Sequence, residues 1–189
     1  FGGYNRYLYT NQLWSKIDFL PFEIRKMIGN LISILPRSRV SGFISFLTGQ
    51  KSSETIEKFF KAGKRLNTVK DIDDLYLSLV TDPYLNKEFF IQNNFAISGF
   101  PETLLTKDFM NSINITNSFD RMMLQDQISY LPDDILCKVD RAAMSNSLET
   151  RAPFLDKELA EFSWRIPSSY KIYKGNTKYV LRESLNRYI

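Results

Sequence analysis

The charged side chains with the greatest potential for chemistry fall in residues 130–145, which read as a helix with an acidic start. On a helix, Asp134, Lys138 and Arg141 are spaced by four and three residues and therefore share one face. Asp133 lies at the helix start, where a carboxylate is favoured. Two interpretations stay open: a solvated helix with an ion pair between Asp134 and Lys138, or a helix that presents its charges to an anionic substrate.

A second charged segment, residues 147–156, alternates charged and small residues before Pro153. Because the residue before proline is disfavoured in helix, we expect an extended turn between two helices. Glu149 and Arg151 would then lie on a loop, either as site residues or as a structural pair. We expect both to be substantially buried and hydrogen-bonded, since buried polar groups are almost always paired.

A third segment, residues 175–183, places Lys178 and Arg182 four residues apart on one helix face. We expect Lys178 in the first turn of that helix, where free backbone N–H groups favour anions. The segment is therefore either a phosphate or carboxylate site or an ordinary basic surface helix.

Composition excludes several classes of chemistry within these 189 residues. The chain has no histidine and one cysteine, Cys137, so it holds no His base, no Ser-His-Asp triad and no Cys or His metal cluster. The net charge of +4 comes from 25 basic and 21 acidic residues that are interspersed, which argues against nucleic-acid binding. No apolar run suits a membrane helix or a signal peptide, and we expect a cytoplasmic protein.

The elements that must position these residues are mostly helices, because apolar residues recur with helical spacing along the chain. We expect Ser118, Asp156 and Thr177 to cap helices, and Pro132 with Asp133 to end one helix and begin the next. Residues 37–53 read as a looser connection, 93–101 as a loop and 170–173 as the one short strand candidate. The expected helices span residues 27–35, 56–60, 72–80, 118–130, 133–145, 156–166 and 177–188. The apolar stripe expected to face the core from the fifth of these is Ile135, Leu136, Val139 and Ala143.

The charged segments and the first residues together resemble a known family. Residues 131–144 read Leu-Pro-Asp-Asp-Ile-Leu-x-Lys-Val-Asp-Arg-Ala-x-Met, and 147–156 read Ser-Leu-Glu-x-Arg-x-Pro-Phe-Leu-Asp; residues 178–183 read Lys-Tyr-x-Leu-Arg-Glu. In this order they resemble the synthetase domain of glutamine-hydrolysing asparagine synthetases. Residues 1–4, Phe-Gly-Gly-Tyr, look like the tail of the family's Gly-x-Asp-Glu-x-Phe-Gly-Gly-Tyr motif, which closes the nucleotide site. The resemblance is strongest over 116–189, while 11–114 do not match residue by residue.

The resemblance implies an ATP-dependent amidation. A carboxylate substrate, aspartate in the parent enzymes, attacks the α-phosphate of ATP, and pyrophosphate leaves as an acyl-adenylate forms. Ammonia, released from glutamine by a separate N-terminal glutaminase domain, then attacks the acyl carbon. Mg²⁺ and basic residues must stabilise the departing pyrophosphate. Relatives of the family act on other acceptors, so aspartate, a sugar acid or another carboxylate all remain open as the acceptor.

The resemblance also implies roles for particular residues. Asp133 or Asp134 is near the position of the acidic residue that the family places by the acyl-adenylate and the amine, although either could instead be a helix cap. No metal ligand is expected in this chain. The implied substrate and ATP contacts are Gly2, Gly3, Tyr4, Lys138 and Arg141.

Several parts of the family pattern do not occur in these residues. The sequence has no Ser-Gly-Gly-x-Asp-Ser phosphate loop and no acidic pair before Phe-Gly-Gly-Tyr. It also lacks the Arg-x-Lys-x-x-Phe segment whose lysine handles pyrophosphate in the family. We therefore expect this chain alone to be inactive in the synthetase reaction.

The resulting expectation for residues 1–189 is a mostly α fold: the helical C-terminal part of an α/β, adenine-nucleotide alpha-hydrolase-like (PP-loop ATP pyrophosphatase) synthetase domain. The alternative is a non-catalytic helical module or degenerate paralogue that acts as a scaffold. Reading the coding DNA upstream of Phe1 would separate the two, because an in-frame glutaminase domain and phosphate loop would favour the enzyme.

Overall fold

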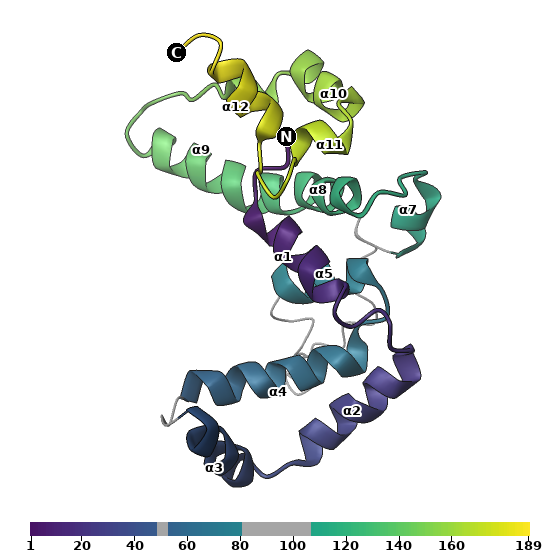
Figure 1. Cartoon of the computed structure of the whole chain (residues 1–189). Helices are drawn as coiled ribbons and strands as arrows, with labels where there is room; N and C mark the ends of the chain where they lie inside the picture. The colour runs from purple at the N-terminus through teal and green to yellow at the C-terminus, as the bar shows by residue number, and fades with distance from the viewer. Residues whose placement is uncertain (49–52, 81–106) are drawn as a thin grey trace. The chain divides into compact units, whose positions relative to one another are not determined.

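A computed structural model describes residues 1–48, 53–80 and 107–189 (Figure 1). The chain divides into two compact units, one formed by residues 1–9 with 99–189 and the other by residues 10–98. The described residues are mostly helical and contain no strand, so the predicted helical character is confirmed. None of their helices is long and apolar enough to cross a membrane.

The unit formed by residues 10–98 is a group of helices in which α2 packs along α4. Its core includes Val40, Val69, Leu75 and Tyr76. Helix α1, Asn5–Trp14, runs across the boundary between the two units. The other helices of this unit are α2 (Phe22–Ile34), α3 (Arg37–Thr48), α4 (Ser53–Thr68) and α5 (Ile72–Val80).

Two glycines allow the close approach of α2 and α4. A Cβ on Gly29 would lie 2.6 Å from the carbonyl oxygen of Gly63, and a Cβ on Gly63 would lie 2.4 Å from Cγ2 of Ile32. Both distances are shorter than non-bonded carbon contacts allow, so only glycine fits at this crossing. Glycine at these two positions therefore determines how closely α2 and α4 approach each other.

A buried arginine joins α2 to the segment that follows α4. Arg25 is 3% exposed, and its guanidinium donates to the carbonyl oxygens of Leu20, Val69 and Lys70 at 3.0–3.1 Å. The Trp14 ring lies 5.0 Å from the guanidinium carbon. Backbone carbonyls that would otherwise be buried without a donor are thereby satisfied.

The unit formed by residues 1–9 and 99–189 is built around α8, whose Met122 and Met123 are buried. A π-helical segment, Leu131–Leu136, connects α8 to α9, and a short 3₁₀ turn, Pro153–Leu155, precedes α10. Tyr173 and Asn176 form an isolated antiparallel bridge. The helices of this unit are α7 (Lys107–Ser112), α8 (Ser118–Ile128), α9 (Cys137–Met144), α10 (Lys157–Arg165), α11 (Ser168–Lys171) and α12 (Tyr179–Leu185).

Several predicted elements have the right type but the wrong extent. Asp156 caps α10 as predicted, and the predicted helix over 72–80 is α5. The predicted connection over 37–53 is wrong, because α3 occupies most of it: its Val40 anchors the helix in the core, which outweighs the weak helix preference of Ser and Gly. The short helix expected at 56–60 belongs to the longer α4. The loop expected at 93–101 lies outside the described residues.

Two predicted caps are wrong, and one predicted helix boundary is confirmed. Asn117, not Ser118, caps α8, since its side-chain oxygen accepts from the N–H groups of Phe119 and Asp120. The predicted boundary at Pro132 and Asp133 is confirmed: α8 ends at Ile128, and a π-helical segment begins at Leu131 with Pro132 and Asp133 in its first turn. Thr177 does not cap α12: Lys178, in the left-handed conformation with φ 56°, precedes the helix instead.

The segments 170–173 and 133–145 also differ from their predictions. Residues 170–171 end α11, so the strand candidate reduces to the single bridge at Tyr173. No residue of α9 is buried, and Val139 is 46% exposed. The prediction that this stripe faces the core is therefore wrong for the described chain, because no described element covers it fully.

Candidate functional site

A pocket of about 310 Å³ lies within the unit formed by residues 1–9 and 99–189. The first four residues form one side of it, and α8, the 3₁₀ turn and α10 form the others. Its lining is rich in aromatic rings with few polar groups between them, a composition typical of small-molecule sites. The aromatic lining residues are Phe1, Tyr4, Tyr7, Tyr130, Phe154 and Trp164, and the ionisable non-aromatic ones are Asp126 and Lys171.

Two glycines let the start of the chain lie against the segment around α11. Gly2 has φ +65°, and a Cβ there would lie 3.1 Å from Cγ1 of Ile172 and 3.4 Å from Cβ of Lys171. An L-residue would therefore be both strained and crowded at this position. A Cβ on Gly3 would lie 2.8 Å from Cε of Lys178, the mobile end of a long side chain. The backbone of residues 2–3 is thus held against α11 and the turn before α12.

Aromatic contacts hold residues from opposite ends of the unit together at the pocket. The rings of Tyr4 and Tyr130 meet edge to face with centroids 5.9 Å apart, as do Phe1 and Phe154 at 5.6 Å. The guanidinium carbon of Arg6 lies 4.3 Å from the Tyr4 ring centroid and 4.5 Å from that of Tyr130. The cation therefore contacts two rings at once, which favours this arrangement of both.

Asp126 connects this aromatic group to α8, the helix that carries it. Its Oδ2 accepts from Nη2 of Arg6 at 2.6 Å and from the hydroxyl of Tyr7 at 2.5 Å. Burial, and next the charge of Asp126, raise the pKa of Tyr7 well above its usual range. Burial likewise raises the pKa of Tyr4. Both hydroxyls are therefore neutral at physiological pH, and Tyr7 serves Asp126 as a donor.

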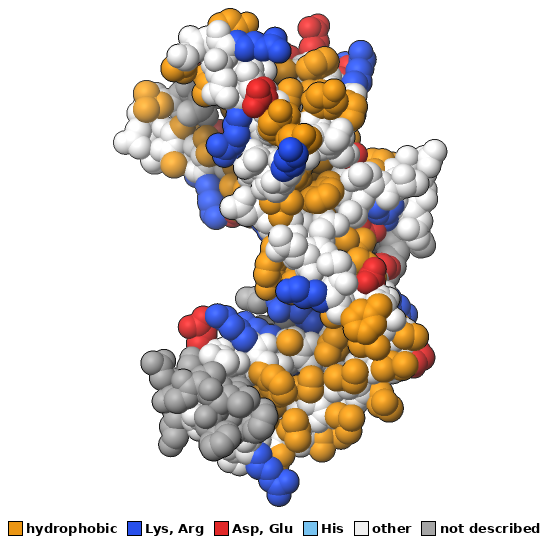
Figure 2. All heavy atoms as spheres, in the orientation of Figure 1, with side chains coloured by type: hydrophobic (Ala, Val, Ile, Leu, Met, Phe, Trp, Pro, Cys, Tyr) orange, Lys and Arg blue, Asp and Glu red, His pale blue; other side chains and the backbone are white. Residues whose placement is uncertain are grey.

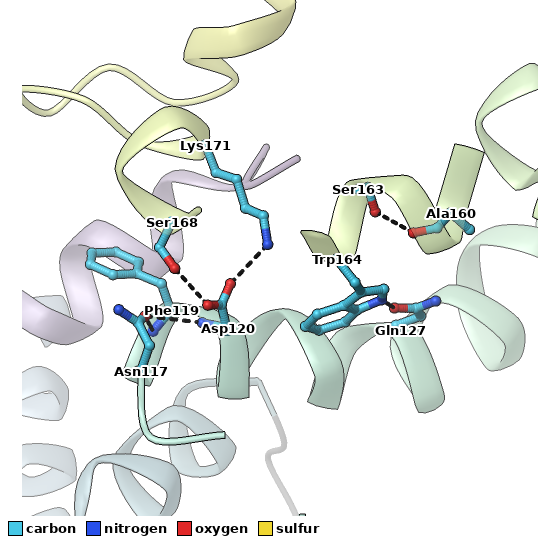
Figure 3. A network of polar contacts seen from close by, with 9 residues as sticks. All are labelled: Asn117, Phe119, Asp120, Gln127, Ala160, Ser163, Trp164, Ser168 and Lys171. Atoms are coloured by element: carbon cyan, nitrogen blue, oxygen red, sulfur yellow. Dashed lines mark hydrogen bonds and ion pairs between the residues drawn. The ribbon is translucent and has the colours of Figure 1, made fainter. Parts of the chain in front are cut away.

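On another side of the pocket, the positive charge of a buried lysine on α11 is compensated by a carboxylate on α8 (Figure 3). The Lys171 side chain is 3% exposed, and its Nζ donates to Oδ1 of Asp120 at 3.0 Å. Ser168 donates to the other oxygen of Asp120 at 2.5 Å. The Lys171 ammonium also lies 5.1 Å from the Trp164 ring, whose N–H donates to Gln127.

Each charged side chain that lines the pocket therefore has a described partner of opposite charge: Asp126 pairs with Arg6, and Lys171 with Asp120. The remaining lining side chains are neutral. Because neither buried pair has a net charge to offer, the pocket suits an uncharged or apolar part of a ligand better than a phosphate or carboxylate.

The predicted site residues divide into two groups. Gly2, Gly3 and Tyr4 line the pocket, whereas the predicted residues of 133–141 are not among its lining residues. Asp134 and Lys138 form the ion pair of the simpler interpretation, with 2.5 Å between their charged atoms and Lys138 72% exposed. Their hydrogen bond raises the pKa of Lys138. Asp133 and Arg141 are exposed, so their catalytic and binding roles stay predictions.

The predicted burial of Glu149 and Arg151 is wrong. They do form an ion pair with each other, but 72% and 86% of their side chains are exposed. The turn that carries them is extended and does not bury the two charged groups, so solvent hydrates the ion pair.

Sequence reasoning missed Arg6, Tyr7, Asp126 and Lys171, which organise the pocket. Their spacing gives no signal, because each pairs with a residue close in space and distant in sequence. The sequence gives only a weak signal for an aromatic site around Arg6, namely the tyrosines at positions 4, 7 and 9.

The described residues do not supply a metal site. They contain no group of three or more His, Cys, Asp or Glu side chains placed to hold an ion. Asp126, which lines the pocket, and Asp120, which binds the lining residue Lys171, are already engaged by cations and hydroxyls. These residues therefore do not fit a resident Mg²⁺.

Comparison with known proteins gives one consistent family. The family model described as Asparagine synthase matches residues 1–189. "Asparagine synthetase [glutamine-hydrolyzing] 1" of Bacillus subtilis is 26% identical over 187 residues, which cover 97% of this chain and 26% of that protein. "Putative asparagine synthetase [glutamine-hydrolyzing]" of Mycobacterium bovis is 46% identical over 65 residues, 34% of this chain and 10% of that protein. No solved structure matches significantly. The chain thus spans about a quarter of the longest-matching of these relatives.

Proposed function

The chain belongs to the asparagine synthase family, and from this premise we propose that it forms part of an enzyme that converts aspartate to asparagine. In that reaction the aspartate side-chain carboxylate attacks the α-phosphate of ATP and pyrophosphate leaves. Ammonia then attacks the activated acyl carbon, AMP leaves, and the amide forms. Glutamine would supply the ammonia through a glutaminase domain, as the names of the relatives indicate for those proteins.

One observation carries this proposal: three of the four segments that hold the family resemblance contribute residues to one pocket. Residues 1–4 contact Tyr130 and Phe154 through their aromatic rings, although more than a hundred positions separate them in sequence. The intervening unit, residues 10–98, contributes no lining residue among those described. Residues of the motifs at 1–4, 131–144 and 147–156 are therefore among those that line the described pocket.

The charge distribution suggests how the site is divided. Because the pocket's own charges are compensated, we assign to it an uncharged part of a substrate, held against Tyr4 and Tyr130. We assign charged parts of the substrates to the exposed positions Lys138 and Arg141, where a phosphate could be approached without dehydrating a buried ion pair. Asp133 and Asp134, at the acidic start of the same segment, are proposed to act on the amine.

The remaining components would come from outside the described residues. Because the described residues do not fit a metal ion, we assign none of them a role in binding Mg²⁺. The phosphate loop and the α/β nucleotide-binding part of the domain are implied by the family alone. Since the reaction consumes ATP, we place it in the cytoplasm.

The test uses the protein as its gene encodes it. We expect asparagine to form from aspartate, ATP and glutamine, and Asp133→Asn and Asp134→Asn to lower that rate strongly while glutamine hydrolysis is nearly unchanged. Glu158→Gln, an exposed carboxylate on α10, is the matched control and should leave both rates unchanged. Normal synthesis in both variants would show that these two carboxylates have only a structural role. Failure of the wild-type protein to amidate aspartate would refute the proposed substrate.

The isolated 189-residue chain provides a second test. We expect it to show no ATP–pyrophosphate exchange with aspartate above a no-enzyme control, because the sequence has no phosphate loop. Measurable exchange would show that the described residues hold more of the synthetase site than we infer.

A further inference from the structure

Arg6 of α1 lies beside two aromatic rings that line the pocket. Its guanidinium carbon is 4.3 Å from the centroid of the Tyr4 ring and 4.5 Å from that of Tyr130. Its Nη2 donates to Oδ2 of Asp126, and its side chain is 26% exposed. A cation that is largely removed from water interacts more strongly with a ring than an exposed cation does. Arg6 therefore connects three side chains from two distant parts of the sequence.

Tyr130 is the residue directly before the π-helical segment Leu131–Leu136. No residue of this segment is buried, so the packing of its own side chains holds it only weakly. The Tyr130 ring, by contrast, contacts both the Arg6 guanidinium and the Tyr4 ring. Its position therefore determines where the segment leaves α8. Short π-helical turns of this kind occur frequently at functional sites.

Asp134 of this segment lies close enough to the Tyr4 hydroxyl to act on it electrostatically. Burial is the main cause of the raised pKa of Tyr4, the neighbouring Tyr130 is the next, and the charge of Asp134 adds to both. The Arg6 cation opposes these effects and lowers the same pKa. The start of the chain and the segment with the candidate carboxylates therefore meet around one guanidinium group.

We propose that Arg6 is a positioning residue of the synthetase site. It holds the Tyr130 ring against Tyr4 and so sets the position of the π-helical segment, without contacting the substrate itself. The inference rests on the proposed amidation, in which Asp133 and Asp134 of that segment act on the amine. Misplacement of a reacting group by about 1 Å can lower a rate by about 100-fold. Lysine cannot replace this arginine fully, because an ammonium group has no planar face to lie against two rings.

Steady-state kinetics of the protein as its gene encodes it test this role. Arg6→Met removes the charge and the planar group but keeps an unbranched side chain. We expect kcat for asparagine synthesis to fall by about 10–100-fold, because the carboxylates are misplaced in the chemical step. KM for aspartate and for ATP should stay within about twofold of wild type, and glutamine hydrolysis should be unchanged. Arg6→Lys keeps the ion pair with Asp126 and should recover part of the loss.

Arg37→Met is the matched control, because Arg37 makes the same two kinds of contact in the other unit. Its Nη1 donates to Oε1 of Glu57 at 2.8 Å, and its guanidinium carbon lies 5.3 Å from the Phe60 ring centroid. Figure 2 shows Lys and Arg side chains on the surface of both units. The control therefore separates the contacts of Arg6 from the loss of one surface cation, and it should leave both rates unchanged.

Fluorine NMR tests the placement of the rings independently of the reaction. The protein is labelled with fluorotyrosine, and the resonances of Tyr4 and Tyr130 are assigned from their Phe variants. We expect both resonances to shift in Arg6→Met and neither to shift in Arg37→Met. Tyr130→Leu removes the ring but keeps the ion pair of Arg6 with Asp126, so it provides a second variant if Arg6→Met does not fold. It should lower kcat to a similar extent and shift the Tyr4 resonance.

The outcomes separate this inference from the proposed function. A wild-type protein that does not amidate aspartate would refute the proposed function, while the fluorine shifts would still test the placement of the rings. Normal kcat in a folded Arg6→Met variant, or unshifted resonances, would overturn the positioning role. A loss of kcat in Arg6→Met that Tyr130→Leu does not reproduce would overturn it as well. Unfolding of both variants would show that the contact serves stability alone.

Discussion

Asp126 is the residue whose replacement should most clearly separate pocket architecture from local helix stability. Its Oδ2 accepts from both Arg6 and Tyr7, and its side chain is 8% exposed. Asp126→Asn preserves the volume and one acceptor oxygen but removes the charge. Because both donors bind Oδ2, the amide oxygen of the new side chain can take that place and accept from both, but without the negative charge.

The expected cost follows from these contacts. A hydrogen bond to a charged partner contributes about 1.5–3 kcal/mol and one between neutral groups about 0.5–1.5 kcal/mol, so each of the two bonds weakens by about 1–1.5 kcal/mol, and the Arg6 cation also loses its countercharge. Arg6 is 26% exposed and can recover part of its hydration, which lowers the sum. We therefore expect Asp126→Asn to reduce the free energy of unfolding by about 2–4 kcal/mol, which corresponds to roughly 6–12 °C in melting temperature.

Thermal unfolding followed by circular dichroism measures this loss. Asp134→Asn is the matched control, because it removes a carboxylate from an exposed ion pair and should leave the melting temperature within error. Fluorescence of the tyrosines near Arg6 should change in Asp126→Asn and not in the control. Equal melting temperatures for the two variants would refute the assignment of Asp126 as the residue that holds the start of the chain to α8.

Three further predictions follow from single contacts. Because the raised pKa of Tyr7 keeps its neutral form favoured in the folded state, wild-type stability should fall as pH rises above about 10, and Tyr7→Phe should fall less in the same titration. Gly63→Ala should cost about 1–3 kcal/mol in denaturant unfolding, since its Cβ would lie 2.4 Å from Ile32, while Gly42→Ala has open space and should be neutral or stabilising. Glu149→Ala should leave the melting temperature unchanged, as its side chain is 72% exposed; a loss of several degrees would contradict the exposed pair.

Local signals in the sequence predicted the local parts of this fold. Asp156 caps its helix as expected because an N-cap depends on a few neighbouring atoms. The helix over 72–80 follows from its apolar spacing alone. The boundary predicted at Pro132 also holds, because proline suits the first turn of a helix, where its missing N–H has no intrahelical partner to lose.

The site shows the opposite relation between sequence and structure. The motif at residues 1–4 predicted that Gly2, Gly3 and Tyr4 contact substrate or ATP; they line the pocket, and those contacts stay a prediction. The ionic partners of that pocket could not be predicted, because Arg6 meets Asp126 across 120 positions. No periodicity or spacing rule reaches across such a distance; only the packed chain brings the two together.

The two buried ion pairs explain why an aromatic pocket can form where charged residues converge. Asp120 neutralises Lys171 from the start of α8, and Arg6 neutralises Asp126 from α1. Each cation also faces an aromatic ring, Lys171 toward Trp164 and Arg6 toward Tyr4. Charge is thereby used to fix the positions of the rings, and no net charge remains to attract an ion into the cavity. The pocket lining therefore suits an uncharged part of a ligand better than a phosphate, because a phosphate would find no uncompensated cation among the described lining side chains.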